Sequence, residues 1–135
     1  MTLHRPGWDD YFLDIAQAVA RRADCRRAQH GAVVVTTDHR ICGCGYNGSP
    51  PGGPSCFEGA CPRGLKTTEE LAHLAGDYSN CRAVHAEANA LLYADHRDTV
   101  GATIYITGEP CSMCAKLIAA AGIARVIYPV GRKHT

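Results

Sequence analysis

The sequence contains no apolar run long enough to cross a membrane, and its N-terminus lacks the basic-then-apolar pattern of a secretory signal peptide. These two absences favour a cytoplasmic protein without a membrane partner. The chain also lacks an excess of charge of one sign, because the net charge of its 135 residues is +1. Proteins that follow a nucleic-acid backbone usually carry a basic excess. We therefore expect a small-molecule partner rather than a nucleic acid polymer, and the length suits a single domain over residues 1–135.

Cysteine, in contrast, is abundant, with eight residues in the chain. One interpretation is the disulfide scaffold of a small secreted protein, and the other is a set of metal ligands or catalytic thiols. The absence of a signal peptide favours the second interpretation. Cys42 and Cys44 lie two apart in a predicted strand, so we expect them to share one face of it as small core residues.

The apolar pattern predicts an α/β protein. Residues 8–23 carry an apolar stripe at helical spacing. The short apolar segments 32–35 and 41–45 predict a pair of adjacent antiparallel strands. The second half of the chain predicts, in order, a helix over 86–94, a strand over 104–107, a helix over 111–120 and a strand over 125–128. A strand, a helix and a strand in so short a space require a parallel strand pair.

Residues 45–54 are too rich in glycine and proline for a regular element. This loop begins where a strand ends, which is a usual place for ligand contacts in α/β sheets. The amide of Asn47 has the donors and the acceptor to hold a sugar hydroxyl, although the same residue also fits a plain Asn-Gly turn. Beyond it, 48–80 is a long insertion in which a capping box at 67–70 predicts a short helix.

Two motifs carry the chemistry, His85-Ala86-Glu87 and Pro110-Cys111-Ser112-Met113-Cys114. Each lies at the start of a predicted helix, so both can meet at one edge of the sheet. A catalytic zinc takes three protein ligands and keeps a fourth position for water, and this pattern is typical of zinc-dependent base deaminases. We therefore predict one catalytic Zn²⁺ on His85, Cys111 and Cys114.

Glu87 is the predicted catalytic residue, two positions after the histidine. It would take a proton from the zinc-activated water and deliver protons to a ring nitrogen and to the departing ammonia. The alternative is a structural zinc site closed by a fourth ligand, either Cys81 or Glu87 itself. Closed sites usually take cysteine or histidine at every position, which favours the catalytic interpretation.

At these residues the sequence resembles the cytidine deaminase superfamily and, within it, the deoxycytidylate deaminase family. The similarity extends from about residue 5 to residue 128 and includes segments outside the zinc motifs, at 8–12, 45–50, 56–59 and 101–105. The block at 45–50 separates this family from nucleoside and tRNA deaminases better than the zinc motifs do.

The resemblance implies a three-layer α/β/α fold with a mixed central sheet, shortened at the C-terminus because the chain stops at Thr135. It implies zinc-dependent deamination of a cytosine nucleotide, for which our best choice is dCMP to dUMP. It also implies a homo-oligomer, since relatives complete their pockets across subunits.

The resemblance further assigns substrate contacts. Asn47 would contact the sugar, the backbone near Ala86 and Pro110 would hold the base, and Arg27 would meet the phosphate. Arg82 is a second phosphate candidate, and for both arginines a solvated surface position is the other interpretation.

Some relatives carry a second, structural zinc at the positions of Cys25 and Cys56, which Cys61 and Cys81 would complete here. The chain departs from its relatives at His30, where they usually have an apolar residue. We expect a different substrate choice if this imidazole points into the pocket.

Other functions stay open at this point. One is deamination of another small aminated ring, such as a modified cytosine nucleotide, a nucleoside, a purine base or a pathway intermediate. A tRNA-editing deaminase is disfavoured by the low net charge, and a non-catalytic zinc module is the alternative outside enzymes.

Overall fold

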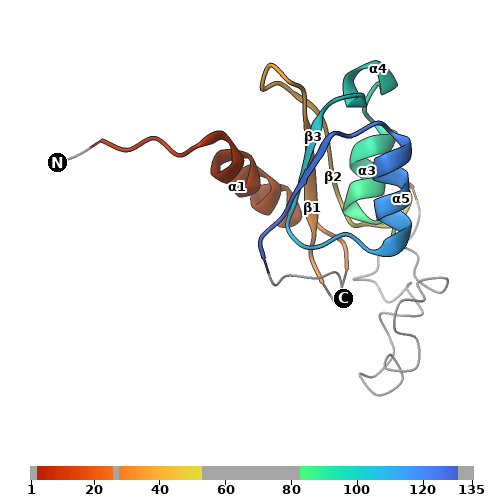
Figure 1. Ribbon diagram of the computed structural model, residues 1–135. Coiled ribbons are helices and arrows are strands. Elements are labelled where there is room, and N and C mark those ends of the chain that lie inside the picture. The colour runs from red at the N-terminus through yellow and green to blue at the C-terminus, as the bar shows by residue number, and fades with distance from the viewer. Residues whose placement is uncertain (1–2, 26–27, 53–82, 131–135) are drawn as a thin grey trace.

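A computed structural model describes residues 3–25, 28–52 and 83–130 of the chain (Figure 1). Its elements are, in order, α1 (Trp8–Ala20), β1 (Gly31–Val35), β2 (Ile41–Tyr46), α3 (Ala86–Leu92), α4 (His96–Thr99), β3 (Thr103–Ile106), α5 (Ser112–Ala120) and β4 (Arg125–Ile127). Every helix and strand expected from the sequence within these residues is present. Helix α1 ends earlier than expected, α4 was not expected, and the helix predicted after residue 67 lies outside the described residues.

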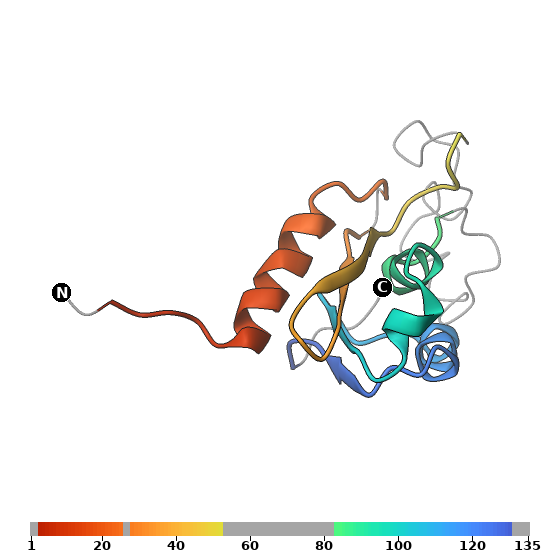
Figure 2. The ribbon, with the colours of Figure 1, turned by 90° about the horizontal axis from the view of Figure 1, so that it is seen from above.

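The strands form one mixed sheet in the order β2-β1-β3-β4. Strand β1 pairs antiparallel with both β2 and β3, whereas β3 and β4 are parallel and are joined by α5. Helix α1 covers one face of the sheet, and α3 and α5 lie side by side on the other (Figures 1 and 2). The predicted three-layer α/β/α arrangement is therefore confirmed.

Strand β1 is the centre of the core because helices cover both of its faces. All five of its residues are buried. Ala32 and Val34 pack into the apolar cluster beneath α3 and α5, and Val33 and Val35 pack against α1 through Phe12 and neighbouring residues. The uninterrupted apolar sequence of this strand follows from that double burial.

The prediction that Cys42 and Cys44 share one face as core residues is wrong. The register shifts between Val34 and Val35, so Cys42 is the extra residue of a β-bulge. Cys42 is half-buried against the cluster beneath α3, whereas Cys44 is exposed and pairs with Val33, whose side chain faces α1. The bulge breaks the alternation of side chains on which the prediction depended.

Helix α1 is fastened to the sheet by a polar contact at its first turn. The hydroxyl of Tyr105 in β3 donates to Oδ1 of Asp9 over 2.7 Å, and Nη2 of Arg125 in β4 donates to Oδ2 over 3.0 Å. The Tyr105 side chain is buried, and burial together with the carboxylate of Asp9 raises its pKa to about 12. Asp9 therefore bridges α1 to two strands on the face opposite α3.

No helix among residues 3–25, 28–52 and 83–130 has both the length and the apolar character that crossing a bilayer requires.

Candidate metal centre

His85 stands immediately before helix α3, as its N-cap residue. Its backbone is extended, with φ −63° and ψ 152°, and its side chain makes no capping hydrogen bond. The helix lies directly on strand β2: a Cβ added to Gly43 would come within 2.6 Å of the Ala90 carbonyl oxygen, and one added to Gly45 within 2.5 Å of the Ala90 nitrogen. The two glycines thus allow the close approach that sets where α3 begins.

Cys111 is the N-cap residue of helix α5, with φ −70° and ψ 167°. Its sulfur accepts a hydrogen bond from the backbone nitrogen of Cys114 over 3.5 Å. The sulfur of Cys111 is therefore the side-chain cap of α5. Pro110 immediately precedes this cap.

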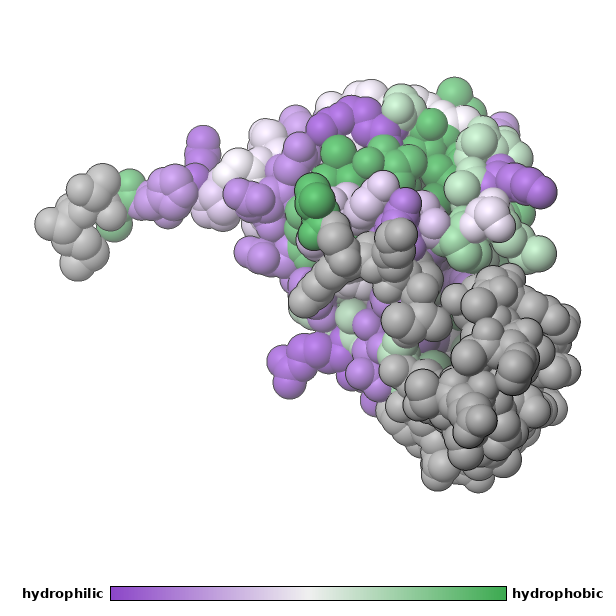
Figure 3. All heavy atoms as spheres, turned by 60° about the horizontal axis from the view of Figure 1, so that its bottom comes forward, coloured by the Kyte–Doolittle hydropathy of each residue, from purple (hydrophilic) through white to green (hydrophobic). Residues whose placement is uncertain are grey.

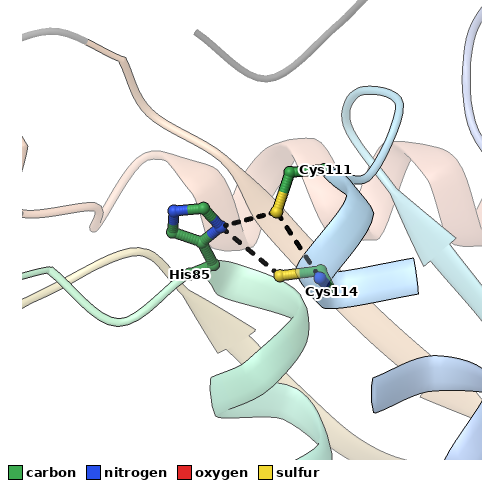
Figure 4. A group of neighbouring side chains, drawn as sticks. All are labelled: His85, Cys111 and Cys114. Carbon is green, nitrogen blue, oxygen red and sulfur yellow. Dashed lines mark hydrogen bonds between the residues drawn. The ribbon is translucent and has the colours of Figure 1, made fainter. Parts of the chain in front are cut away.

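The two helix starts meet at one point (Figure 4). Nδ1 of His85 lies 3.5 Å from Sγ of Cys111 and 3.4 Å from Sγ of Cys114. The three potential ligand atoms lie within 4.8 Å of one another. The predicted convergence of His85, Cys111 and Cys114 is therefore confirmed.

These separations fit a tetrahedral zinc ion. Zinc bonds of about 2.05 Å to nitrogen and about 2.3 Å to sulfur, at the tetrahedral angle, separate the two ligand atoms by about 3.5 Å. The nitrogen–sulfur distances of 3.4 and 3.5 Å match that value. A neutral imidazole and two thiolates suit zinc chemically, and within the part of the chain that the structure describes these are the three residues that form such a group.

Without a bound metal ion, the protein groups around the Cys114 thiol oppose its ionisation. Burial raises the pKa of the Cys114 thiol, and the negative charges of Glu87 and Cys111 raise it further. A bound cation inverts this balance, because a coordinating thiol is deprotonated outright. The site is therefore built for a positive ion.

Glu87 lies in the first turn of α3 and its side chain is fully buried. Its effect on the pKa of Cys114 places the carboxylate next to the ligand group. Burial of a carboxylate is costly unless something compensates its charge. A cation at the three ligands would contribute to that compensation. The alternative fourth ligand, Cys81, lies outside the described residues.

Asn47, the predicted sugar contact, is buried at the end of β2. Its Oδ1 accepts from the backbone nitrogen of His30 over 2.7 Å, and its Nδ2 donates to the carbonyl of Ala28 over 2.9 Å. The amide nitrogen has two N–H groups and the amide oxygen has two lone pairs. Each of the two hydrogen bonds of Asn47 therefore uses one of the two bonding positions of its atom. Asn47 thus orders the segment before β1.

The structure describes some of the other predicted site residues but not all of them. Ala86 is buried in the first turn of α3, Pro110 is half-buried before α5, and Cys25 is buried after α1. The phosphate candidates Arg27 and Arg82, and the remaining ligands of the second zinc, Cys56, Cys61 and Cys81, lie outside the described residues. These assignments stay predictions.

Two residues whose side chains make hydrogen bonds to the backbone were not singled out from the sequence. The hydroxyl of Thr107 at the end of β3 accepts from the backbone nitrogen of Gly31 over 3.1 Å and lies 3.4 Å from Nδ1 of His30. Nδ2 of Asn89 in α3 donates to the backbone carbonyl oxygens of Tyr46 and of Val84, the residue before His85. Asn89 is the one polar residue of α3 besides Glu87, and this was the available signal for it.

Comparison with known proteins extends the similarity over nearly the whole chain. Residues 6–130 match the family model described as the cytidine and deoxycytidylate deaminase zinc-binding region. The chain is 52% identical over 128 residues to the protein named deoxycytidylate deaminase of Mycobacterium phage D29, covering 94% of this chain and 98% of the phage protein. It is 40% identical to the deoxycytidylate deaminase of Saccharomyces cerevisiae, of whose length it spans 38%.

Solved structures share the fold. The dCMP deaminase of cyanophage S-TIM5, in complex with dCMP and dUMP, has a TM-score of 0.68 and 26% identity, covering 93% of this chain and 83% of that one. The RibD protein of Acinetobacter baumannii has a TM-score of 0.59 and 25% identity, with 90% of this chain and 27% of that chain covered.

Proposed function

Because the chain belongs to the cytidine and deoxycytidylate deaminase family, we propose that it hydrolyses dCMP to dUMP and ammonia. The single observation that carries this proposal is the meeting of His85, Cys111 and Cys114 around a space that fits zinc, next to a buried Glu87. The choice of dCMP is supported by the name of the phage relative, nearly all of whose length is matched, and by the nucleotides bound in the cyanophage structure.

The three ligands would hold the ion through Nδ1 of His85 and through the two sulfurs. When bound, zinc would lower the pKa of a water molecule to about 7. Coordination through Nδ1 requires that atom to be unprotonated, so the imidazole proton sits on Nε2.

Glu87 would carry the protons. Its carboxylate takes one from the attacking water and gives it to the ring nitrogen next to the reacting carbon. Once the water oxygen has bonded to that carbon, the carboxylate takes the second proton from the same oxygen. It delivers this proton to the amino group as the carbon–nitrogen bond breaks, so that water and the amine are converted to a carbonyl and ammonia. Complete burial keeps bulk water from exchanging with this proton and keeps the carboxylate in one position.

Substrate contacts are proposed at the same edge of the sheet. Asn47 retains one N–H and one lone pair for a sugar hydroxyl, and backbone groups near Ala86 and Pro110 lie at the two helix starts where the base would sit. Arg27 is the proposed phosphate contact. Since a phosphorylated nucleotide does not cross a bilayer unaided, we also place the enzyme in the cytoplasm.

We further propose that the protein is a homo-oligomer. Helix α5 exposes an apolar surface, with Met113 70% and Leu117 44% exposed. Next to it, Pro110, Val126 and other mainly apolar residues line a hollow of about 370 Å³. In the space-filling view, hydrophobic side chains gather in the middle of one face of the molecule (Figure 3). Such a surface favours burial against a second copy.

The activity is tested by measuring ammonia release from cytosine, deoxycytidine, dCMP and dCTP under identical conditions with the zinc-loaded protein. We expect dCMP to have the highest kcat/KM. Faster turnover of another member of this panel, or of a purine or pathway intermediate added to it, would replace dCMP as the substrate. If a zinc-loaded sample released ammonia from none of these compounds, the protein would be a zinc-stabilised binding module instead.

A further inference from the structure

Asn89 connects the first turn of α3 to the two chain segments that flank His85. Its Nδ2 atom donates to the carbonyl oxygen of Tyr46, at the end of β2, over 2.8 Å. The same nitrogen donates to the carbonyl oxygen of Val84 over 3.3 Å. Val84 is the residue immediately before His85, so this amide bonds the backbone at the point from which the metal-binding imidazole projects.

The Val84 carbonyl is also part of a second connection. Val84 and Gly48 form an isolated antiparallel bridge, with Gly48 N donating to Val84 O over 3.1 Å and Val84 N donating to Gly48 O over 2.7 Å. The Val84 oxygen therefore accepts from two donors, one in the loop after β2 and one in α3. Asn89 is the group that joins this bridge to the helix.

The fit around Asn89 is close. A Cβ added to Gly45 would lie 2.7 Å from the Cβ of Asn89 and 2.5 Å from the nitrogen of Ala90. Helix α3 and strand β2 are thus in direct backbone contact at this point. A side chain as short as that of Asn89 therefore reaches the carbonyl oxygen of Tyr46. Inside the helix, the backbone nitrogen of Asn89 donates to His85 O over 3.0 Å.

The backbone at His85 bears directly on where its ring lies. His85 is the N-cap residue of α3 without a capping hydrogen bond from its side chain, and Nδ1 of its ring faces the two sulfurs. The backbone conformation at Val84 and His85 therefore contributes to the direction of the ring. Metal ligands must be held to within a few tenths of an ångström, and groups that orient them typically change metal affinity by about 10–100-fold.

We propose that Asn89 is a positioning residue for the metal centre: its amide fixes the backbone at Val84–His85 so that Nδ1 of His85 faces Cys111 and Cys114. An amide nitrogen suits this task because its two N–H groups can serve two carbonyl oxygens at once. This inference rests on the proposed zinc site, and it assigns to Asn89 no contact with substrate.

The test compares zinc affinity, measured by competition with a chelator, in wild type, Asn89→Asp and a matched control. Asn89→Asp keeps the shape of the side chain but places carboxylate oxygens against two carbonyl oxygens. The control is Thr99→Val, since the buried Thr99 hydroxyl also lies against two backbone carbonyls, 3.0 Å from His96 O and 2.8 Å from Ala121 O, at the opposite end of α5 from Cys111. Both substitutions disturb a buried polar contact, but only one of these contacts borders the metal ligands.

We expect Asn89→Asp to weaken zinc binding by about 10–100-fold and to alter the visible absorption of the Co²⁺-substituted protein. Thr99→Val should lower thermal stability while leaving both readouts unchanged. If Asn89→Asp does not fold, the neutral variant Asn89→Ala, which removes the donors without adding charge, is expected to change both readouts in the same direction.

Wild-type zinc affinity and an unchanged Co²⁺ spectrum in the Asn89 variants would overturn the proposal. Equal losses of zinc affinity in the Asn89 and Thr99 variants would do the same, because the effect would then be general destabilisation. Failure of the wild-type protein to bind zinc at all is a separate result, which would overturn the proposed function.

Discussion

Nδ1 of His85 lies 3.4 Å from Sγ of Cys114, although the two residues are 29 positions apart in the chain. The separation is close to the distance between two ligands of one zinc ion. It is produced by two helices that begin at the same edge of the sheet, with α3 fixed on β2 and α5 joining the parallel pair of β3 and β4. The chemistry of this protein depends on that meeting of helix starts.

Zinc removal should abolish both activity and a part of the stability. We expect dialysis against a strong chelator to eliminate ammonia release and to lower the unfolding temperature, because the buried Glu87 and the two thiols lose the cation that compensates their charge. Added zinc should restore both properties. The measurement is metal content by elemental analysis alongside activity and thermal unfolding. Full activity in a demonstrably metal-free sample would contradict the assignment.

The same elemental analysis counts the sites. Two zinc ions per chain are expected if Cys25, Cys56, Cys61 and Cys81 form the predicted structural site, and Cys56→Ser should then reduce the count to one without removing the ion from His85. One zinc per wild-type chain would end the second-site prediction and leave the catalytic site intact.

Among the five cysteines that the structure describes, Cys44 should be the easiest to modify. Cys44 is exposed on β2. Cys42, at the β-bulge of the same strand, is half-buried, and burial raises the pKa of its thiol. With zinc bound, Cys111 and Cys114 are expected to be protected as metal ligands. Mass spectrometry after brief treatment with a thiol reagent should show one fewer label on Cys44→Ser than on wild type. An identical label count would mean that Cys44 is covered in solution.

Tyr105 should make stability depend on alkaline pH. Its pKa rises from 10.0 to about 12 on folding, first because of burial and then because its hydroxyl donates to Asp9. A raised pKa means that the folded state retains the proton, so the stabilisation is full below pH 10 and is lost as the pH rises toward 12.

We therefore expect Tyr105→Phe to lower the free energy of unfolding by about 1 kcal/mol at pH 7. The difference between wild type and this variant should shrink between pH 10 and 12 in denaturant titrations. A difference that stays constant across that range would contradict a raised pKa of Tyr105 in the folded state.

If the apolar surface of α5 is the oligomer interface, a charge placed on it should weaken the association of subunits. Leu117→Lys should reduce the molar mass measured by light scattering, since a charge buried against a second copy is costly. Ile41→Lys is the matched control, because Ile41 is similarly exposed, at 47% against 44% for Leu117, but lies on the edge strand β2 at the other end of the sheet. An unchanged mass for Leu117→Lys, or equal changes in both variants, would argue against α5 as the interface.

The sequence predicted the helices, the strands and the metal ligands from local patterns, whereas the three layers were implied by the resemblance to the deaminase family. The β-branched run of β1 and the helical spacing of apolar residues in α1 identify elements directly. The H-x-E and P-C-x-x-C motifs identify their own helix starts. Gly122, with φ +82°, follows the end of α5 in the left-handed conformation that favours glycine. Each of these signals lies within a few neighbouring residues.

What the sequence could not predict depends on register and on long-range contacts. The bulge that separates Cys42 from Cys44 arises from pairing with Val34 and Val35, which no period in β2 itself reveals. The bonds from Asn89 to Tyr46 and Val84 appear only once α3 lies on β2. The identity of a polar residue was visible in the sequence, but its partners were not.

The most direct test of the account is the deamination rate of zinc-loaded Glu87→Gln relative to wild type, with metal content measured on the same samples. Because glutamine keeps the size of the buried side chain but cannot carry protons between water and the ring, we expect zinc to be retained and kcat to fall by a factor of about 10²–10⁴. Turnover at the wild-type rate with zinc bound would contradict the assignment of Glu87 as the proton carrier.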